Sequence, residues 1–303
     1  MYKITSKWPH QDSIHVEWNL GKRCNLDCSY CPSEIHDNIS PHTNFDILKL
    51  AADKLLEIKK PLRISFTGGE PCVNPDLPKL LDYLKDKVSW INITTNGTMT
   101  EQFYFKLPVN HYVFSLHVED SKNWERCMMN ILLFGQQNET AVPNTTPFQI
   151  NLMAHHSFMD RVRLAADMFD SHFIPYVVRR IRWTKAEDRD YFDDMRYSAE
   201  DLNWLLNKSS TANPNCIVDD YEEIHANDII KTKRNYFKNW KCNAGIESLM
   251  INWDGDVHRA TCRVGGSLGN IYKGNFEIPV EPIICTREWC TCAADIPLTK
   301  VLK

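Results

Sequence analysis

Between residues 14 and 183, the sequence alternates six short runs rich in Val, Ile, Phe, Tyr and Thr with longer segments that carry apolar residues at helical spacing. We expect each β-rich run to form a strand and each intervening segment to form a helix. Strands that alternate with helices pair in parallel, which allows either a barrel or an open doubly wound sheet. The six expected strands are Ile14–Leu20, Leu62–Thr67, Ser89–Thr95, Tyr112–His117, Phe148–Met153 and Ile174–Ile181.

The pattern changes after Trp183. A helix is expected from Ala199 to Leu206 with Ser198 as its N-cap, and residues 208–228 are expected to form a loop-rich insertion. Two β-rich runs around Asp254-Gly255-Asp256 predict a hairpin over residues 248–262. The remainder is rich in Gly, Pro and Cys and short of core-forming pattern, so we expect bound metal to stabilise it. The chain divides into an N-terminal extension (1–13), an α/β domain (14–197), a helical and loop-rich bridge (198–239) and a small Cys-rich hairpin domain (240–303).

Eleven cysteines in 303 residues require an explanation. The first ten residues lack the apolar core of a signal peptide, and no segment approaches the ~18 consecutive apolar residues of a membrane helix. We therefore expect a cytoplasmic protein without a membrane partner, in which reducing conditions favour metal ligation over disulfides. The net charge of −4 and the lack of a basic stripe argue against a nucleic-acid partner.

Three cysteines, Cys24, Cys28 and Cys31, follow the first expected strand with the spacing CxxxCxxC. Three thiolates on one tight loop can bind three irons of a 4Fe–4S cluster and leave the fourth iron open, as a catalytic cluster requires. The alternative is a zinc site. Structural zinc prefers four ligands, often as two CxxC pairs, and the three-residue first gap fits that arrangement poorly.

The second expected strand ends in Phe66-Thr-Gly-Gly-Glu-Pro71. Gly68 and Gly69 allow close approach of the backbone to a ligand, and Glu70 offers a carboxylate at the carboxyl end of a strand, where barrel active sites lie. A simple turn between strand and helix is the alternative interpretation. The third strand ends in Thr94-Thr-Asn-Gly97 and the fourth in Ser115-Leu-His117.

Together these motifs resemble the radical S-adenosylmethionine (SAM) superfamily, whose hallmark is CxxxCxΦC with an aromatic Φ, here Tyr30. The resemblance implies a partial (β/α)6 TIM-like barrel. It implies SAM bound at the open iron of a 4Fe–4S cluster, and an electron that cleaves SAM to methionine and a 5′-deoxyadenosyl radical. That radical abstracts hydrogen from a substrate. A reductant such as flavodoxin or ferredoxin is the implied electron donor.

The resemblance also implies which residues contact SAM. Glu70 belongs to the motif that binds the amino group, Asn96 faces the cofactor, Ser115 contacts the ribose and Met153 flanks the adenine. Strand alternation puts Arg180 and Arg182 on one face and Arg179 on the other. An inward arginine would bind a carboxylate of the substrate or of SAM, and a solvated strand end is the alternative interpretation. For His117 a surface or loop position is equally compatible with the sequence. The expected cofactor-binding residues are Tyr30, Gly68, Gly69, Glu70, Asn96, Ser115, Met153 and Arg180.

A second group of five cysteines follows residue 240: Cys242, Cys262, Cys285, Cys290 and Cys292. With Cys242-Asn-Ala-Gly245, Trp253–Val257 and Gly269-Asn270, it resembles the SPASM/twitch extension of radical SAM enzymes. Five cysteines imply one auxiliary 4Fe–4S cluster. Which two of Cys285, Cys290 and Cys292 join the other ligands stays open, and zinc is the main alternative.

We therefore expect a radical SAM enzyme that oxidises or crosslinks a peptide or a small metabolite. Two other enzyme reactions stay open: radical epimerisation, and a rearrangement like that of molybdopterin-precursor synthesis. A non-enzymatic iron–sulfur or zinc scaffold is the third alternative. The sequence identifies neither a catalytic side chain nor the substrate.

Overall fold

The protein is described by a computed structural model that covers residues 1–7, 12–120, 122–140, 147–181 and 196–302. Arg182, which we expected to share a strand face with Arg180, lies outside the described residues.

Six parallel strands, paired in sequence order, form the centre of the molecule and confirm the predicted strands to within two residues at each end. Each strand is followed along the chain by a helical segment, as the alternating pattern predicted. The strands are β2 (Ile14–Asn19), β3 (Leu62–Thr67), β4 (Trp90–Thr95), β5 (His111–His117), β6 (Phe148–Ala154) and β7 (Tyr176–Arg180).

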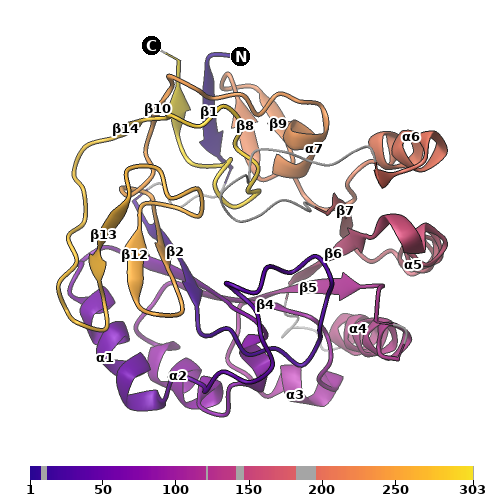
Figure 1. The fold of residues 1–303 in the computed structure, drawn as a ribbon, viewed down its shortest axis with the longest axis horizontal. Coiled ribbons are helices and arrows are strands. Elements are labelled where there is room, and N and C mark those ends of the chain that lie inside the picture. Colours follow the sequence, from indigo (N-terminus) through magenta and orange to yellow (C-terminus); the bar gives the residue numbers. More distant parts are fainter. Residues whose placement is uncertain (8–11, 121, 141–146, 182–195, 303) are drawn as a thin grey trace.

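Helices cover the convex side of this curved sheet (Figure 1). Apolar side chains from alternate strand positions, such as Val16, Phe66 and Phe114, are fully buried against them. The other face of each strand points into the concave side. The helices are α1 (Phe45–Leu56), η1 (Pro71–Val73), α2 (Leu77–Leu84), α3 (Glu101–Phe105), α4 (Trp124–Thr140), η2 (His156–Phe158), α5 (Met159–Ser171) and α6 (Ala199–Asn207).

The prediction of α6 is confirmed together with its cap. The Ser198 hydroxyl accepts a hydrogen bond from the backbone N–H of Asp201 at 3.0 Å, which satisfies one of the free donors at the start of the helix. At the start of α1, the side chain of Asn44 likewise accepts from the backbone N–H of Ile47 at 3.1 Å.

The predicted hairpin is present, but it extends the large sheet. β11 (Ser248–Ile251) pairs in parallel with β2, and β12 (Asp256–His258) pairs antiparallel with β11 and with β13 (Ser267–Asn270). The order of the nine strands is β13-β12-β11-β2-β3-β4-β5-β6-β7, so β13 and β7 are its two edges. The described strands thus form an open, partial barrel, as the resemblance implied.

A second sheet of six strands lies over the concave side of the first (Figure 1). Its order is β14-β10-β15-β1-β8-β9. We expected residues 208–228 to form a loop-rich insertion. They contain two strands, β8 and β9, and the start of α7 (Ala226–Lys231). The strands are β1 (Lys3–Ser6), β8 (Cys216–Val218), β9 (Glu222–Ile224), β10 (Lys241–Cys242), β14 (Ile283–Ile284) and β15 (Lys300–Val301).

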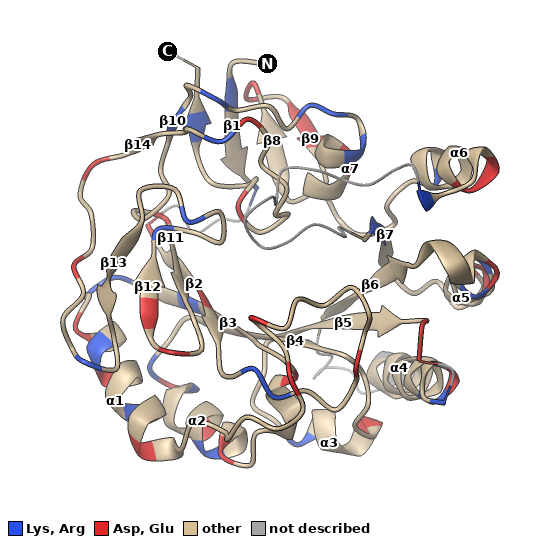
Figure 2. Ribbon diagram, in the orientation of Figure 1, with Lys and Arg blue, Asp and Glu red and all other residues tan. Residues whose placement is uncertain are grey.

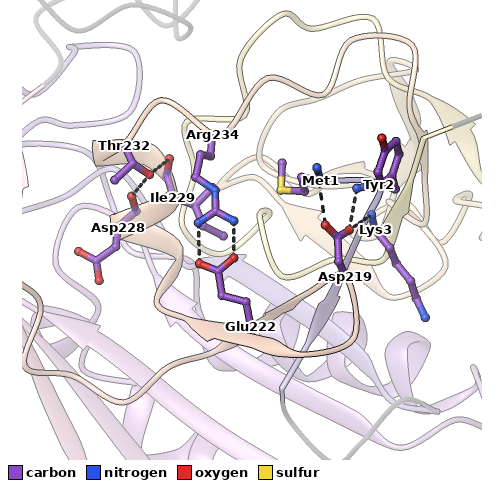
Figure 3. A network of polar contacts seen from close by, with 9 residues as sticks. All are labelled: Met1, Tyr2, Lys3, Asp219, Glu222, Asp228, Ile229, Thr232 and Arg234. Carbon is purple, nitrogen blue, oxygen red and sulfur yellow. Dashed lines mark hydrogen bonds and ion pairs between the residues drawn. The ribbon is translucent and has the colours of Figure 1, made fainter.

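The strands of the second sheet come from three of the four segments into which we divided the chain. The turn between β8 and β9 contributes Asp219, whose carboxylate accepts hydrogen bonds from the backbone N–H groups of Tyr2 and Lys3 at 2.6 and 2.9 Å (Figure 3). Arg234 pairs with Glu222 at the other end of this turn (Figure 3). These contacts fix β1 against β8, and the division of the chain into four domains stays a prediction.

Positive and negative side chains are interspersed along the outer helices (Figure 2). Among the described residues, no helix has both the length and the apolar character needed to cross a membrane. The expectation that nucleic acid is not a partner rests on charge and stays a prediction.

Candidate functional site

Cys24, Cys28 and Cys31 lie on a closed loop at the carboxyl end of β2. The backbone N–H of Cys24 donates to the carbonyl of Asp37 at 2.7 Å, and the N–H of Asp37 donates to the carbonyl of Lys22 at 3.0 Å. These two bonds join the beginning and the end of the loop. A tight turn, closed by the N–H of Cys31 on the carbonyl of Cys28 at 3.0 Å, holds the second and third thiols together.

The backbone at Gly68 and Gly69 packs directly on the base of this loop. The N–H of Gly69 donates to the carbonyl of Gly21 at 2.8 Å, and the N–H of Glu70 donates to the carbonyl of Arg23 at 2.9 Å. A Cβ atom on Gly69 would lie 2.3 Å from the carbonyl oxygens of Lys22 and Arg23. The two glycines are thus required because the loops after β2 and β3 touch through their backbones.

Glu70 is buried, and its carboxylate joins the ends of β3 and β4. It accepts hydrogen bonds from the N–H of Cys72 at 2.9 Å, the Thr95 hydroxyl at 2.7 Å and the N–H of Asn96 at 2.7 Å. Burial raises the pKa of Glu70, while these three hydrogen bonds and a fourth from the Cys72 thiol oppose that shift.

Asn96 links the end of β4 to the cysteine loop. Its side-chain amide donates to the Asn25 side chain at 2.8 Å and lies 3.8 Å from the sulfur of Cys24. Its carbonyl oxygen accepts from the hydroxyl of Thr98 at 2.7 Å. The residue is thus held in one orientation next to the first cysteine.

His117 lies inside the site, where we had left a surface or loop position open. Its Nδ1 atom lies 3.6 Å from the sulfur of Cys28 and hydrogen-bonds the Tyr30 hydroxyl, and the two rings stack with centroids 6.0 Å apart. Burial lowers the pKa of His117 to about 4, so the ring is neutral at pH 7. The signal for this placement was the two-residue period, which puts His117 on the same inward face as Ser115.

The three thiols are in an environment that suits a cationic cluster. Burial and the neighbouring cysteines raise the pKa values of Cys28 and Cys31 to about 12. Thiolates at these positions therefore need positive charge close by, which iron supplies. Within the described part of the chain, no three His, Cys, Asp or Glu side chains are arranged to hold a single metal ion. Each thiolate of a 4Fe–4S cluster binds a different iron, so its ligands need not converge.

The inward arginine of β7 is Arg179 and not Arg180. Partners in the parallel register share a face, and the register pairs His117 with Met153 and Met153 with Arg179. Arg180 pairs instead with Ala154, which is fully buried in the core under the helices. The expected cofactor role for Arg180 thus loses its geometric basis. Ser115 and Met153 lie on the inward face, which is compatible with the SAM contacts that the resemblance implied.

The interior of the partial barrel is polar. A chain of hydrogen bonds crosses four strands: His15 to the Ser65 hydroxyl at 2.8 Å, Asn92 to the same hydroxyl at 3.2 Å, and His111 to Asn92 at 2.7 Å. TIM barrels usually fill this space with branched apolar side chains. Here it forms part of a cavity of about 800 Å³, whose walls offer hydrogen bonds to a polar ligand.

His15 and His111 are expected to make the protein less stable in mild acid. Burial and the charge of Arg63 lower both pKa values from 6.5 to about 4. The folded state therefore binds fewer protons than the unfolded state between pH 4 and 6.5, and the free energy of unfolding falls as pH falls through that window. Each histidine contributes at most on the order of 3 kcal/mol to this loss.

Urea unfolding at pH 7.0 and 5.0 measures this effect. The difference between the two pH values should shrink in His15→Gln, because glutamine does not titrate. It should persist in His172→Gln, which changes the C-cap of α5 outside the cavity. An unchanged pH dependence in His15→Gln would contradict the prediction.

Most of the C-terminal cysteines gather around Lys300. Its buried ammonium group donates to the backbone carbonyls of Asp295, Ile296 and Leu298 at 2.5, 3.1 and 3.2 Å. Burial lowers the pKa of Lys300, but the surrounding negative groups outweigh it and raise the pKa. Those groups are Cys242, Cys290, Asp295 and Cys262.

Cys285 and Cys292 take different positions. Cys242 pairs with Ile283 in the antiparallel register of β10 and β14. The pairing continues beyond β14, where the N–H of Cys285 donates to the carbonyl of Trp240 at 2.8 Å. Cys285 therefore lies diagonally across from Cys242 on the same face. Cys292 instead lines the large cavity together with Arg179, and the two side chains interact electrostatically.

Several proteins resemble this chain in sequence. The antilisterial bacteriocin subtilosin biosynthesis protein AlbA of Bacillus subtilis (strain 168) is 26% identical over 275 residues, which cover 87% of this chain and 58% of that protein. The Fe-coproporphyrin III synthase of Methanosarcina barkeri (strain Fusaro / DSM 804) is 35% identical over 88 residues, 29% of this chain and 22% of that protein. The chain thus spans less than two thirds of the length of each of these relatives.

Two solved structures share the fold. The structure of anSMEcpe with bound AdoMet and Cp18Cys peptide superposes with a TM-score of 0.58 at 15% identity, over 87% of this chain and 78% of that one. Streptococcus suis SuiB superposes with a TM-score of 0.53 at 16% identity, over 86% of this chain and 64% of that one. These likenesses concern the arrangement of the backbone.

Residues 18–131 match the family model described as the Radical SAM superfamily. The matched segment begins in β2 and ends in α4, so it contains the three-cysteine loop and the ends of β3 and β4 that pack on it. Enzymes of this superfamily use a 4Fe–4S cluster together with SAM. Residues 18–131 of this chain therefore form a domain of the Radical SAM superfamily.

Proposed function

We propose that Cys24, Cys28 and Cys31 ligate the SAM-binding 4Fe–4S cluster, and that SAM lies along the carboxyl ends of β3 to β6. One observation carries this proposal: the backbone of Gly69 and Glu70 hydrogen-bonds the base of the cysteine loop at 2.8 and 2.9 Å. The thiols are thereby brought to the edge of the sheet where the parallel strands end. Tyr30, Gly68, Gly69, Glu70, Asn96, Ser115 and Met153 remain the proposed SAM contacts.

A cluster held by Cys24, Cys28 and Cys31 would supply the electron for reductive cleavage of SAM and hence for hydrogen abstraction from a substrate. The residues of this chain position the cysteine loop and shape the site around it. Asn96, held by Asn25 and Thr98, fixes the side of the site next to Cys24. Neutral His117 and Tyr30 do the same next to Cys28. The polar cavity beneath them is the proposed substrate site.

We propose that Cys242, Cys262, Cys285 and Cys290 ligate an auxiliary 4Fe–4S cluster and that Cys292 is not a ligand. Three of the four surround Lys300, and Cys285 shares a face with Cys242. Cys292 points to the cavity beside Arg179. With four cysteine ligands this cluster has no open iron, which suits a cluster that accepts an electron.

The proposed reaction is therefore a net oxidation or crosslinking of a peptide or a small metabolite. The relation to AlbA, a protein of subtilosin biosynthesis, supports a peptide substrate. A rearrangement is the second candidate, because the GTP 3′,8-cyclase of Syntrophomonas wolfei subsp. wolfei (strain DSM 2245B / Goettingen) is 34% identical over 97 residues, 30% of this chain and 29% of that protein. A flavodoxin or ferredoxin as reductant and a cytoplasmic location stay predictions.

Anaerobic SAM cleavage tests the proposal. The protein reconstituted with iron and sulfide and reduced with dithionite should form 5′-deoxyadenosine, and Cys28→Ala should lose this activity, because one iron ligand is missing. Cys127→Ala removes a buried thiol of α4 that belongs to neither cysteine group, and should retain the activity. No 5′-deoxyadenosine from the unmodified protein would favour the non-enzymatic scaffold.

A further inference from the structure

The large cavity lies between the two sheets. One wall is the inward face of β2 to β7, with residues such as Ser65, Asn92 and Asn151. The opposite wall comes from the start of the chain and from two later segments: Thr5–Lys7, Asn213–Asn215 and residues 292–294. The cavity therefore reaches from the second sheet to the middle of the partial barrel, and its volume of about 800 Å³ admits a medium-sized organic molecule.

Arg179 contributes a guanidinium group to the wall of this cavity. It lies on the inward face of β7 and is half-buried. No described residue forms a hydrogen bond or an ion pair with its guanidinium group. A guanidinium carries five N–H donors, and donors removed from bulk water are normally paired. Within the cavity, the acceptors therefore come from water or from a ligand that replaces it.

The described acidic residues near Arg179 form no ion pair with its guanidinium group. Burial lowers the pKa of Arg179, while electrostatic interactions with Cys292 and Glu17 oppose this shift. The Glu17 carboxylate accepts a hydrogen bond from the Thr261 hydroxyl at 3.2 Å. His225 faces the same cavity, and burial together with Arg179 lowers its pKa to about 4, so at pH 7 it adds no charge.

The other carboxylate of the cavity wall is occupied. Glu247 accepts hydrogen bonds from the Asn243 side chain at 2.6 Å and from the N–H of Thr299 at 2.8 Å. Arg63 adds a second guanidinium to the cavity, close enough to His15 and His111 to lower their pKa values. A ligand thus meets two guanidinium groups and two carboxylates that already accept hydrogen bonds from the protein.

Arg179 also lies next to the first cysteine site. His117, which touches Cys28, pairs with Met153 on the neighbouring strand, and Met153 pairs with Arg179 on the next. Adjacent strands are about 4.8 Å apart, so the backbones at His117 and Arg179 are separated by about 10 Å. A ligand held by Arg179 therefore extends toward the place where the proposed chemistry occurs.

We propose that Arg179 binds an acidic group of the substrate, a carboxylate or a phosphate, by charge-assisted hydrogen bonds, and that the substrate is therefore an anion. Arg179 lies in the cavity that we propose as the substrate site. The inference that the bound anion is a substrate therefore rests on the proposed function. Arg180, one residue along the same strand and on the opposite face, offers a matched control.

Isothermal titration of the reconstituted protein with citrate and with pyrophosphate, at constant ionic strength, tests the proposal and distinguishes the two acidic groups. We expect at least one of these probes to bind, and Arg179→Gln to weaken its binding about tenfold or more. Arg180→Gln should leave the affinity unchanged, and Arg179→Lys should restore part of it. Binding of neither probe, or equal loss in both Gln variants, would overturn the proposal.

A measurement on the unmodified protein avoids the case in which a variant loses binding only because it misfolds. Phenylglyoxal labels accessible guanidinium groups, and the bound probe should protect Arg179 while the exposed Arg126 on α4 reacts equally with and without probe. Labelling of Arg179 that the probe does not reduce would contradict the inference. Neither measurement requires SAM cleavage, so a protein that binds the probe but forms no 5′-deoxyadenosine would refute the proposed function alone.

Discussion

Gly69→Ala is expected to abolish cluster binding at Cys24, Cys28 and Cys31 while the barrel stays folded. The added Cβ would lie 2.3 Å from two carbonyl oxygens at the base of the cysteine loop, and those oxygens belong to rigid backbone. The loop must shift by about 1 Å or more to remove this clash, and such a displacement commonly costs about 100-fold in rate. Iron content after reconstitution and formation of 5′-deoxyadenosine are the measurements.

Gly21→Ala is the matched control for this variant. Gly21 lies in the same loop contact, but a Cβ atom there would meet nothing within 4 Å. The control should keep its iron and its SAM cleavage, and the thermal midpoints of both variants should show an intact core. If Gly69→Ala retained full iron content, the contact between the two loops would not be what positions the thiols.

Cys290→Ala is expected to remove one of two clusters. A protein with both proposed clusters holds about eight irons, and the loss of a buried ligand should leave about four. Cys290 lies in the group of thiols around Lys300, and its loss leaves one iron of the proposed auxiliary cluster without its cysteine ligand, which should make this cluster labile. Iron analysis and the electron paramagnetic resonance spectrum of the reduced protein measure the change.

Cys292→Ala is the comparison variant for the auxiliary site. Cys292 lies two residues from Cys290 but lines the cavity, and its loss should leave about eight irons. The opposite pattern, with iron lost from Cys292→Ala and kept in Cys290→Ala, would reverse the proposed ligand set. About four irons in the unmodified protein would remove the auxiliary cluster from the proposal.

Local sequence patterns predicted the six strands and the contacts at their ends. The run Leu62–Thr67 is confirmed residue for residue, because alternation, β-branched side chains and the following Gly-Gly all agree. The motifs at residues 24–31, 68–70 and 94–97 do meet at one edge of the sheet. That meeting follows from parallel pairing, which brings all the carboxyl ends to one side.

Long-range pairing was not predictable in the same way. β8 and β9 have three residues each, too few to show a period, and β11 joins β2 across more than two hundred residues of sequence. The choice between Arg179 and Arg180 failed for a related reason. A shift of one residue exchanges the two faces of a strand, and only the register with Met153 and Ala154 fixes which arginine points inward.

The placement of β1 has a consequence for how the chain reaches its native state. Its partners are β8 and β15, and Tyr2 meets Asp219 across 217 positions of sequence. Contacts between such distant segments form slowly, because a large loop must close before they are gained. β1 therefore stays unpaired until β8 has been synthesised, and its second partner, β15, follows only at the end of the chain. Closure of the second sheet, which also brings Cys242 next to β14 and β15, is then a late step of folding.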